Sequence, residues 1–167
     1  RCFGVRSSWR LMDTDPKTKV SEVKTTVATS ADLVYEDEQR RATYTTDARL
    51  NGPEGDLRAQ KIELYLATGG DQLERLEAYT DVTLHTENRE SAGARLSYFA
   101  ADDRYVMSTV AGAPDVRILE QLAQECRETL GKTLTFHRAT DTIAVDGSDE
   151  RRTQTTSGGK CPEPRPR

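Results

Sequence analysis

Hydrophobic and polar residues alternate along most of the chain from Lys24 onward, in short stretches separated by polar breaks. A period of two is typical of half-buried β-strands, because successive strand residues point to opposite faces of a sheet. Leu33 and Tyr35 fall on one face, an acidic tip follows at residues 36–38, and Tyr44 resumes the pattern on a returning stretch. The pattern therefore predicts a β-hairpin here and a largely all-β protein.

Turn residues divide the later stretches. Asn-Gly-Pro-Glu-Gly-Asp at residues 51–56 and Thr-Gly-Gly-Asp at residues 68–71 both contain glycines, which adopt positive φ at no steric cost. A third turn is expected at residues 100–103. The alternation slips by one residue near Gln60 and Lys61, and we expect a β-bulge or a corner of the sheet at that point.

One segment departs from the period of two. Apolar residues recur there at spacings of three and four, as on an amphipathic helix, at Leu119, Leu122, Ala123, Cys126 and Leu130. We therefore expect one short helix near residues 119–130.

The two ends of the chain lack alternation. Residues 1–23 read as a disordered leader or linker, and residues 157–167, with Gly and alternating Pro, read as an extended tail. Residues 24–156 are then one domain, in keeping with a length of 167 residues. The Thr-rich stretch at residues 151–156 is expected to be an edge strand.

Charge narrows the choice of partners. The net charge is −4, the calculated isoelectric point is about 5.3, and basic residues alternate with acidic ones. A nucleic-acid partner is therefore not expected, because phosphates select a clustered basic face. No run approaches the roughly 18 apolar residues of a membrane-spanning helix.

Three cysteines are present, Cys2, Cys126 and Cys161, with no Cys-X-X-Cys pair and no histidine at ligand spacing. A metal site is therefore not expected. In an oxidising compartment Cys126 and Cys161 can close a loop of about 35 residues, which the chain-entropy model values at about 4 kcal/mol. Three unpaired thiols are the alternative.

No pattern of catalytic residues stands out. The sequence lacks GxSxG, P-loop, HExxH and dinucleotide-binding fingerprints, and His85 and His137 stand beside no cysteine or carboxylate motif. We therefore expect a protein that is not an enzyme and holds no cofactor.

A short phrase recurs at intervals of roughly 30 to 38 residues. It consists of an apolar residue, one spacer and an aromatic residue or Leu, and it occurs at Leu33-Val34-Tyr35, Ile62-Glu63-Leu64, Leu96-Ser97-Tyr98 and Leu134-Thr135-Phe136. Such a period indicates one supersecondary unit stacked on copies of itself, because one copy cannot bury its apolar face alone.

Several longer phrases resemble the OstA-like domain, a family that includes LptA, LptC and the N-terminal domain of LptD. The resemblance covers roughly residues 25–156 and is carried, in order, by residues 31–35, 41–50, 55–62, 93–98 and 103–107. The sequence departs from the family where the phrase threonine, glycine, asparagine is usual, because Thr46 and Asp47 stand there.

The resemblance implies an antiparallel β-jelly roll folded like a taco shell, built from repeated hairpins, in the bacterial periplasm. It implies a transport protein that shields the acyl chains of lipopolysaccharide, or a related glycolipid, in an apolar groove and bridges inner and outer membrane components. Other β-jelly-roll components would join through edge strands, and a head-to-tail homo-oligomer is a further expected assembly. Arg58, Lys61 and Arg95 are then candidates to contact lipid phosphates near the groove mouth, and ordinary solvated surface charges are the alternative for all three.

A lipid groove requires apolar area, so the inward-facing apolar residues are the candidate site. The expected lipid-binding residues are Leu33, Tyr35, Tyr44, Leu50, Leu57, Ile62, Leu64, Leu76, Val82, Leu84, Leu96, Tyr98, Tyr105, Met107, Ile118, Leu134, Phe136 and Ile143. In the first rival interpretation the same residues fill the solid core of a β-sandwich that only joins partner sheets. A carbohydrate-active β-solenoid enzyme is the second rival.

Overall fold

The computed structural model describes residues 2–53, 55–147 and 153–162, and within them the secondary structure consists of β-strands without a helix. The expected all-β class is confirmed. The strands are β1 (Cys2–Thr14), β2 (Ser21–Glu36), β3 (Arg41–Gly52), β4 (Gly55–Leu66), β5 (Leu73–His85), β6 (Arg89–Phe99), β7 (Arg104–Ser108), β8 (Val116–Gln121), β9 (Cys126–Gly131), β10 (Thr133–His137), β11 (Thr142–Asp146) and β12 (Gln154–Gly158).

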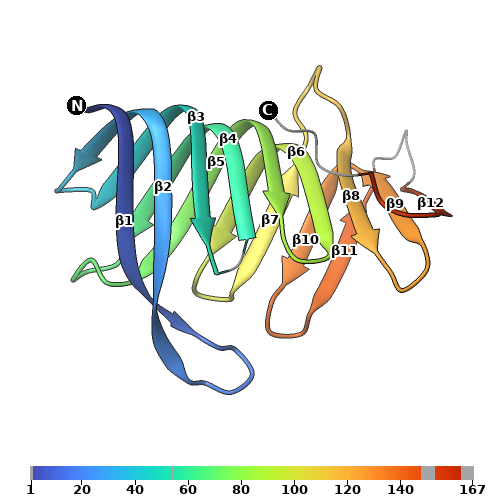
Figure 1. Ribbon diagram of the computed structural model, residues 1–167, viewed down its shortest axis with the longest axis horizontal. Coiled ribbons are helices and arrows are strands. Elements are labelled where there is room, and N and C mark those ends of the chain that lie inside the picture. The colour runs from blue at the N-terminus through green and yellow to red at the C-terminus, as the bar shows by residue number, and fades with distance from the viewer. Residues whose placement is uncertain (1, 54, 148–152, 163–167) are drawn as a thin grey trace.

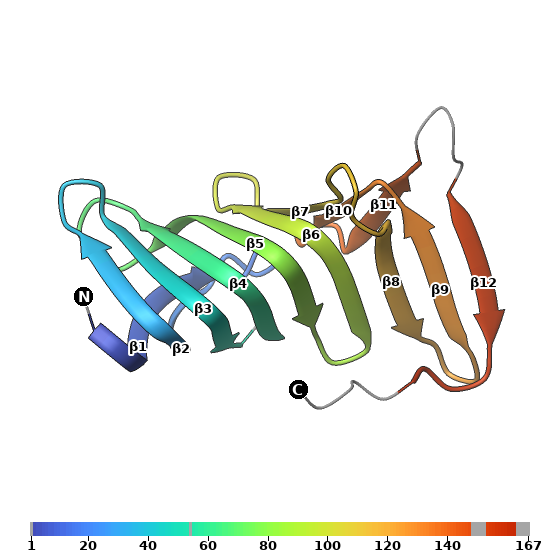
Figure 2. The ribbon, with the colours of Figure 1, turned by 90° about the horizontal axis from the view of Figure 1, so that it is seen from above.

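All strand pairs are antiparallel, and neighbours in sequence are mostly neighbours in the sheet (Figure 1). The stack runs β1-β2-β3-β4-β5-β6 and then divides, because the two halves of β6 pair with different strands. The half at residues 95–99 pairs with β7, and the half at residues 89–92 pairs with β8. Figure 2 shows the resulting group of β8, β9 and β12 at one end of the molecule.

A corner bends the long strands β2, β3, β4 and β5 near their middle. Thr46 and Asp47 in β3 have φ of 66° and 48°, and Thr80 and Asp81 in β5 have φ of 66° and 51°. Register shifts lie beside both pairs, so each is a β-bulge that turns the strand. The parity slip near Gln60 was a correct sign of this corner, since β4 shifts register between Arg58 and Lys61.

The corner divides the sheet into two arms that face each other. The first arm contains residues 32–36, 41–45, 61–66, 73–79 and 95–99 with β7, β10 and β11. The second arm contains residues 21–29, 48–52, 55–58, 82–85 and 89–93 with β8, β9 and β12. The turns between strands form the two lips of the opening between the arms.

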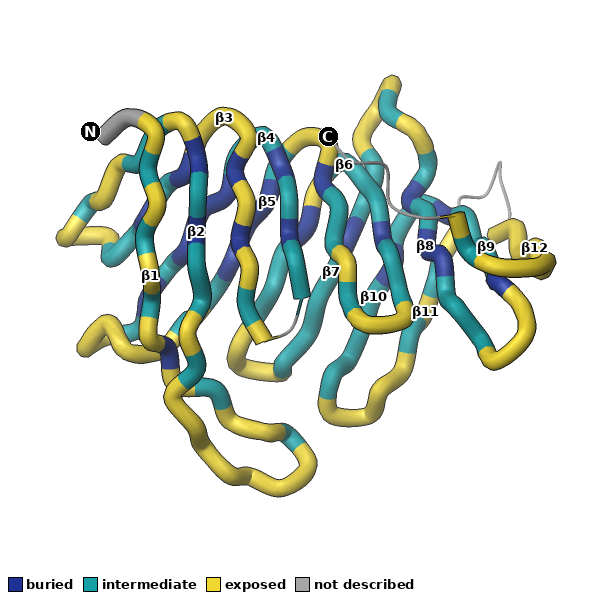
Figure 3. Tube along the Cα trace, in the orientation of Figure 1, coloured by how far each residue is buried: buried dark blue, intermediate teal, exposed yellow. Residues whose placement is uncertain are grey.

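The predicted repeat corresponds to rows of paired residues across the first arm. Direct cross-strand partners form one row, Leu33, Tyr44, Ile62, Ala78, Leu96, Met107, Leu134 and Val145. The next row consists of Tyr35, Ala42, Leu64, Leu76, Tyr98, Tyr105, Phe136 and Ile143. These rows face the second arm and contribute most of the core, which runs along the stack as the buried positions in Figure 3 show. The repeated phrase therefore places its apolar residues at equivalent positions in β2, β4, β6 and β10.

The helix expected near residues 119–130 is wrong. This segment is the hairpin of β8 and β9, with a tight turn in which Leu122 N–H donates to the Glu125 carbonyl at 2.8 Å. Leu119 and Cys126 are buried although the turn separates them. Apolar residues on the two sides of a short turn thus produced a spacing that resembles a helix.

The N-terminal segment also differs from the expectation of a disordered leader at residues 1–23. Residues 2–14 form β1, which pairs with β2 from Cys2–Leu33 to Thr14–Ser21. Val5, Trp9 and Leu11 alternate with Arg6, Arg10 and Met12, and Leu11 is buried. Apolar residues do recur here with a period of two, but Ser7 occupies one of the positions where an apolar residue is expected, which weakened the prediction of a strand.

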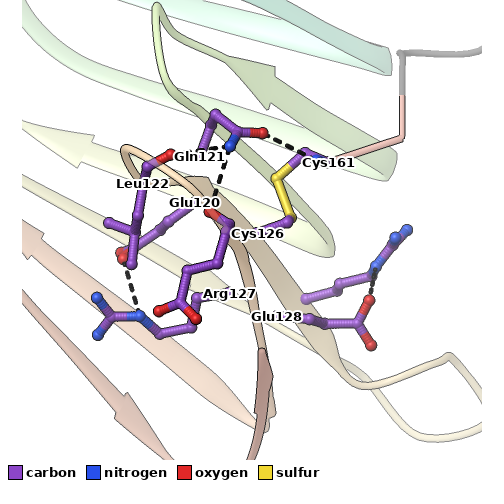
Figure 4. Close-up of a disulfide and its surroundings, with 9 residues drawn as sticks. Glu120, Gln121, Leu122, Cys126, Arg127, Glu128 and Cys161 are labelled. Carbon is purple, nitrogen blue, oxygen red and sulfur yellow. Dashed lines mark hydrogen bonds and ion pairs between the residues drawn. A yellow bond between two sulfur atoms is a disulfide. The ribbon is translucent and has the colours of Figure 1, made fainter. Parts of the chain in front are cut away.

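The C-terminal segment is held by the expected disulfide, shown in Figure 4. Cys126 and Cys161 are bonded, with their Cα atoms 4.8 Å apart, and Cys161 N–H donates to Gln121 Oε1 at 2.8 Å. Residues 154–156 of the expected edge belong to β12, which pairs with β9 alone among the described strands. Arg151 and Arg152 of that stretch, and residues 163–167 of the expected tail, lie outside the described residues.

Candidate functional site: an apolar groove between the arms

An apolar groove runs between the two arms. Three adjoining cavities of about 110, 430 and 500 Å³ make up the groove, and Pro53 and Tyr105 line all three. The smallest cavity lies among leucines of both arms, namely Leu50, Leu57, Leu64, Leu73, Leu76, Leu84 and Leu96. The largest cavity opens at the lips and adds polar residues to the lining. The arms therefore leave space between their apolar faces.

Most of the candidate site residues lie in the walls of these cavities. They are Leu50, Leu57, Leu64, Leu76, Leu84, Leu96, Tyr98, Tyr105, Met107, Ile118, Leu134, Phe136 and Ile143. The remaining candidates lie elsewhere. Tyr44 and Ile62 are closed off in the core, Leu33 packs against that core, Tyr35 is 47% exposed, and Val82 borders a separate cavity near the corner.

Three further apolar or weakly polar positions, Leu11, Thr26 and Leu73, line the groove although they were not among the candidates. Leu11 lies in the segment that was interpreted as a linker. The alternation of Val5, Trp9 and Leu11 was a usable signal for it. Leu73 follows a turn directly, where no neighbouring alternation marked its direction.

An aromatic ladder forms part of the groove wall in the first arm. The ring centroids of Tyr98 and Tyr105 are 4.5 Å apart, and those of Tyr105 and Phe136 are 6.1 Å apart. Tyr98 donates its hydroxyl hydrogen to Asp103 Oδ1 at 2.9 Å. Burial and the nearby Asp103 carboxylate raise the pKa of Tyr98 well above its usual range, so the phenol stays neutral and amphipathic at the groove mouth.

A charged cluster lies at the mouth beside this ladder. Arg138, whose side chain is 14% exposed, donates from Nη1 and Nη2 to the two carboxylate oxygens of Asp13 at 3.0 and 3.1 Å. Its Nε lies 3.6 Å from Asp103 Oδ2, and Lys24 Nζ lies 2.7 Å from Asp13 Oδ2. Burial raises the pKa of Asp13, but the hydrogen bonds from Arg138 and Lys24 outweigh it, so this pKa is lowered overall.

The basic residues suggested for lipid phosphates do not line the groove cavities. Lys61 and Arg95 pack over the ring of Tyr79, at 4.8 and 4.6 Å from its centroid. Lys61 also pairs with Glu63 at 2.6 Å, a carboxylate that is 5% exposed. These side chains alternate with groove residues along β4 and β6, so they cover the outer face of the first arm. Arg58 pairs with Asp56 at 3.0 Å instead of reaching the groove.

Among the described residues, no cluster of His, Cys, Asp and Glu has the arrangement needed to hold a metal ion. Over the same part of the chain, no helix is long and apolar enough to cross a membrane. The residues that line the groove offer apolar contact along its length, and the charged cluster offers ion pairing at its mouth.

The fold and the groove define an antiparallel β-jelly roll of the kind found in lipopolysaccharide-transport proteins. Residues 27–142 match the family described as LptA/(LptD N-terminal domain) LPS transport protein. The chain belongs to this family, whose members are transport proteins and not enzymes.

Comparison with solved structures agrees with this fold. LptH from Pseudomonas aeruginosa is described as the LptA-homologous periplasmic component of the conserved lipopolysaccharide transport device. Its crystal structure superposes with a TM-score of 0.60 and 11% sequence identity, covering 79% of this chain and 92% of LptH. No curated protein sequence shows a significant match.

Proposed function

We propose that this protein works in the periplasm and carries lipopolysaccharide, or a related glycolipid, with the acyl chains in the groove and the sugars in solvent. The observation that carries the proposal is the leucine-lined space between the arms, which a solid β-sandwich would not leave open. Membership of a lipopolysaccharide-transport family and the likeness to LptH support the choice of cargo and compartment.

The groove offers an acyl chain mainly apolar contact. Burying one methylene gains roughly 0.8 kcal/mol, so a chain of a dozen carbons gains on the order of 10 kcal/mol before ordering costs are subtracted. The cavity that Leu84, Leu96, Ile118 and Phe136 help to line has a volume of about 430 Å³. The groove runs across the strands, so a chain lying in it would contact residues from several repeats.

The edges of the sheet support a role in bridging the two membranes. Among the described strands, β1, β11 and β12 each pair with a single neighbour. Unpaired backbone groups on such edges recruit strands from other chains. We infer that further β-jelly-roll components, or copies of this chain in a head-to-tail arrangement, extend the stack and continue the groove.

A charge placed inside the groove tests the proposal. Leu84 is half-buried and lines two of the cavities, so Leu84→Glu puts a carboxylate where an acyl chain would lie. We expect the Kd for dansyl-labelled undecanoic acid to rise at least tenfold, because leaving a charge against hydrocarbon costs more than about 1.4 kcal/mol. Lipid A should compete with the probe for the wild-type protein.

Val34→Glu is the matched control, because Val34 is 40% exposed and its cross-strand partner Thr43 lies on the outer face. This variant should bind like the wild type. Circular dichroism checks that both variants keep their fold. A folded wild-type protein that shows no saturable probe binding would contradict the proposal and favour an interaction module with a solid core.

A further inference from the structure

The hairpin between β1 and β2 extends beyond the rest of the second arm. Residues 21–26 of β2 pair with β1 alone, because pairing between β2 and β3 starts at Val27–Asn51. Figure 1 shows this hairpin projecting past the neighbouring strands. We call residues 11–25 the flap.

The flap crosses the opening and reaches the lip of the opposite arm. Met12 N–H donates to the carbonyl of Asp71, in the turn between β4 and β5, at 2.7 Å. Asp13 accepts the two hydrogen bonds from Arg138, which lies in the turn between β10 and β11, 125 residues further along the chain. Both turns belong to the first arm, whereas the flap grows from the second arm. The flap therefore lies across the groove mouth.

The underside of the flap forms part of the groove. Leu11 is 9% exposed and lines the cavities of about 110 and 500 Å³, and Lys17 lines the cavity of about 430 Å³. An acyl chain that enters the groove on this side must pass these residues. The flap, and not only the two arms, therefore covers part of the groove mouth.

The flap has few apolar contacts to hold it down. Leu11 is its one buried residue, while Met12, Val20 and Val23 are 38%, 55% and 55% exposed. Segments with little apolar burial open at low free energy. The contacts that fasten the flap to the far lip are therefore mainly polar, and Arg138 is central because it bonds to Asp13 and also lies 3.6 Å from Asp103.

We propose that the flap is a gate over the groove, latched to the first arm by the Asp13–Arg138 ion pair, and that release of this latch admits the acyl chain. This inference rests on the proposed function, because it assigns the flap a role in loading that same groove. Arg138 acts here as a positioning residue. A surface ion pair would contribute little, but this pair is bidentate and half-shielded from solvent.

The test removes the latch and measures flap opening and lipid loading separately. In Arg138→Gln, backbone amide exchange in residues 11–25 should become about tenfold faster, which corresponds to about 1.4 kcal/mol. Stopped-flow association of dansyl-labelled undecanoic acid should accelerate by a similar factor, since the open population sets the rate. Asp13→Asn is the second, milder variant and should shift both readouts in the same direction.

Arg117→Gln is the control for the loss of an arginine charge away from the flap, because it breaks a more exposed Arg–Glu pair in the second arm, with Arg117 Nε 3.1 Å from Glu128 Oε2. It should leave exchange and association unchanged. Unchanged exchange in the flap for both latch variants would overturn the gate. Faster exchange with an unchanged association rate would also overturn it. If neither the wild type nor any variant binds the probe, the proposed function fails and the gate has no role in loading. Amide exchange in residues 11–25 would still show whether the Asp13–Arg138 pair holds the flap closed.

Discussion

Replacing Tyr44 with Phe tests how β1 is attached to the core. The ring of Tyr44 is 1% exposed, and its hydroxyl oxygen accepts a hydrogen bond from Trp9 Nε1 at 2.6 Å. A second hydrogen bond joins this hydroxyl to Ser7 Oγ, also at 2.6 Å. Trp9 and Ser7 both belong to β1, so one buried hydroxyl ties the first strand of the stack to the third.

The magnitude follows from the two lost bonds. Phenylalanine keeps the packed ring but leaves the Trp9 N–H and the Ser7 hydroxyl without this partner in a half-buried site. A net loss of about 1 kcal/mol for each bond predicts that the free energy of unfolding falls by about 2 kcal/mol. With a urea dependence of about 2 kcal/mol per molar, the midpoint should fall by about 1 M.

Tryptophan fluorescence is the assay, because Trp9 is the single tryptophan of the chain and reports directly on β1. Tyr35→Phe is the control. Tyr35 is 47% exposed and its ring centroid lies 6.4 Å from that of Trp9, so this variant keeps the ring contact and loses only the hydroxyl of an exposed side chain. An unfolding midpoint of Tyr44→Phe equal to that of the control would refute the reasoning.

Two further predictions concern the corner and the disulfide. Thr46 has a φ of 66°, which is strained for a β-branched residue, so Thr46→Gly should stabilise the protein by about 1 kcal/mol. Thr45→Gly, at a position without positive φ, should destabilise the protein. The free energies of unfolding of the two variants are compared by urea denaturation. Replacing Cys126 and Cys161 by serine should lower the free energy of unfolding by up to about 4 kcal/mol in the chain-entropy model. Amide exchange in β12, whose residues are all exposed, should also become faster. Unchanged exchange in β12 would contradict this prediction.

The sequence predicted the repeating parts of the fold well, because strand alternation and turn chemistry act over a few residues. Leu33, Ile62, Leu96 and Leu134 were assigned to equivalent positions of a repeat, and cross-strand pairing places them in one row. The parity slip near Gln60 likewise indicated a corner. Thr46 adopts the left-handed backbone where the family usually has glycine, so the bend persists although the usual residue is missing.

Local pattern was misleading where a turn interrupts the alternation or where a partner lies far away in the chain. Leu119 and Cys126 imitate a helix because the period is read across a tight turn. Leu11 was missed although Val5, Trp9 and Leu11 alternate with polar residues, because this signal is short. The contacts that fix the strand, its pairing with β2 and the Tyr44 hydroxyl, lie outside a window of a few residues.

The sequence by itself determined that the chain forms antiparallel strands, where most of them turn, and which apolar residues face inward. Only the tertiary structure decided that the two inner faces stand apart to leave a groove, and that a flap crosses its mouth. The physical reason is that both features depend on contacts between distant residues, such as Asp13 and Arg138, 125 positions apart. The alternation of residues indicates which side of each strand is apolar. The bend at the corner determines how far the apolar face of one arm lies from that of the other.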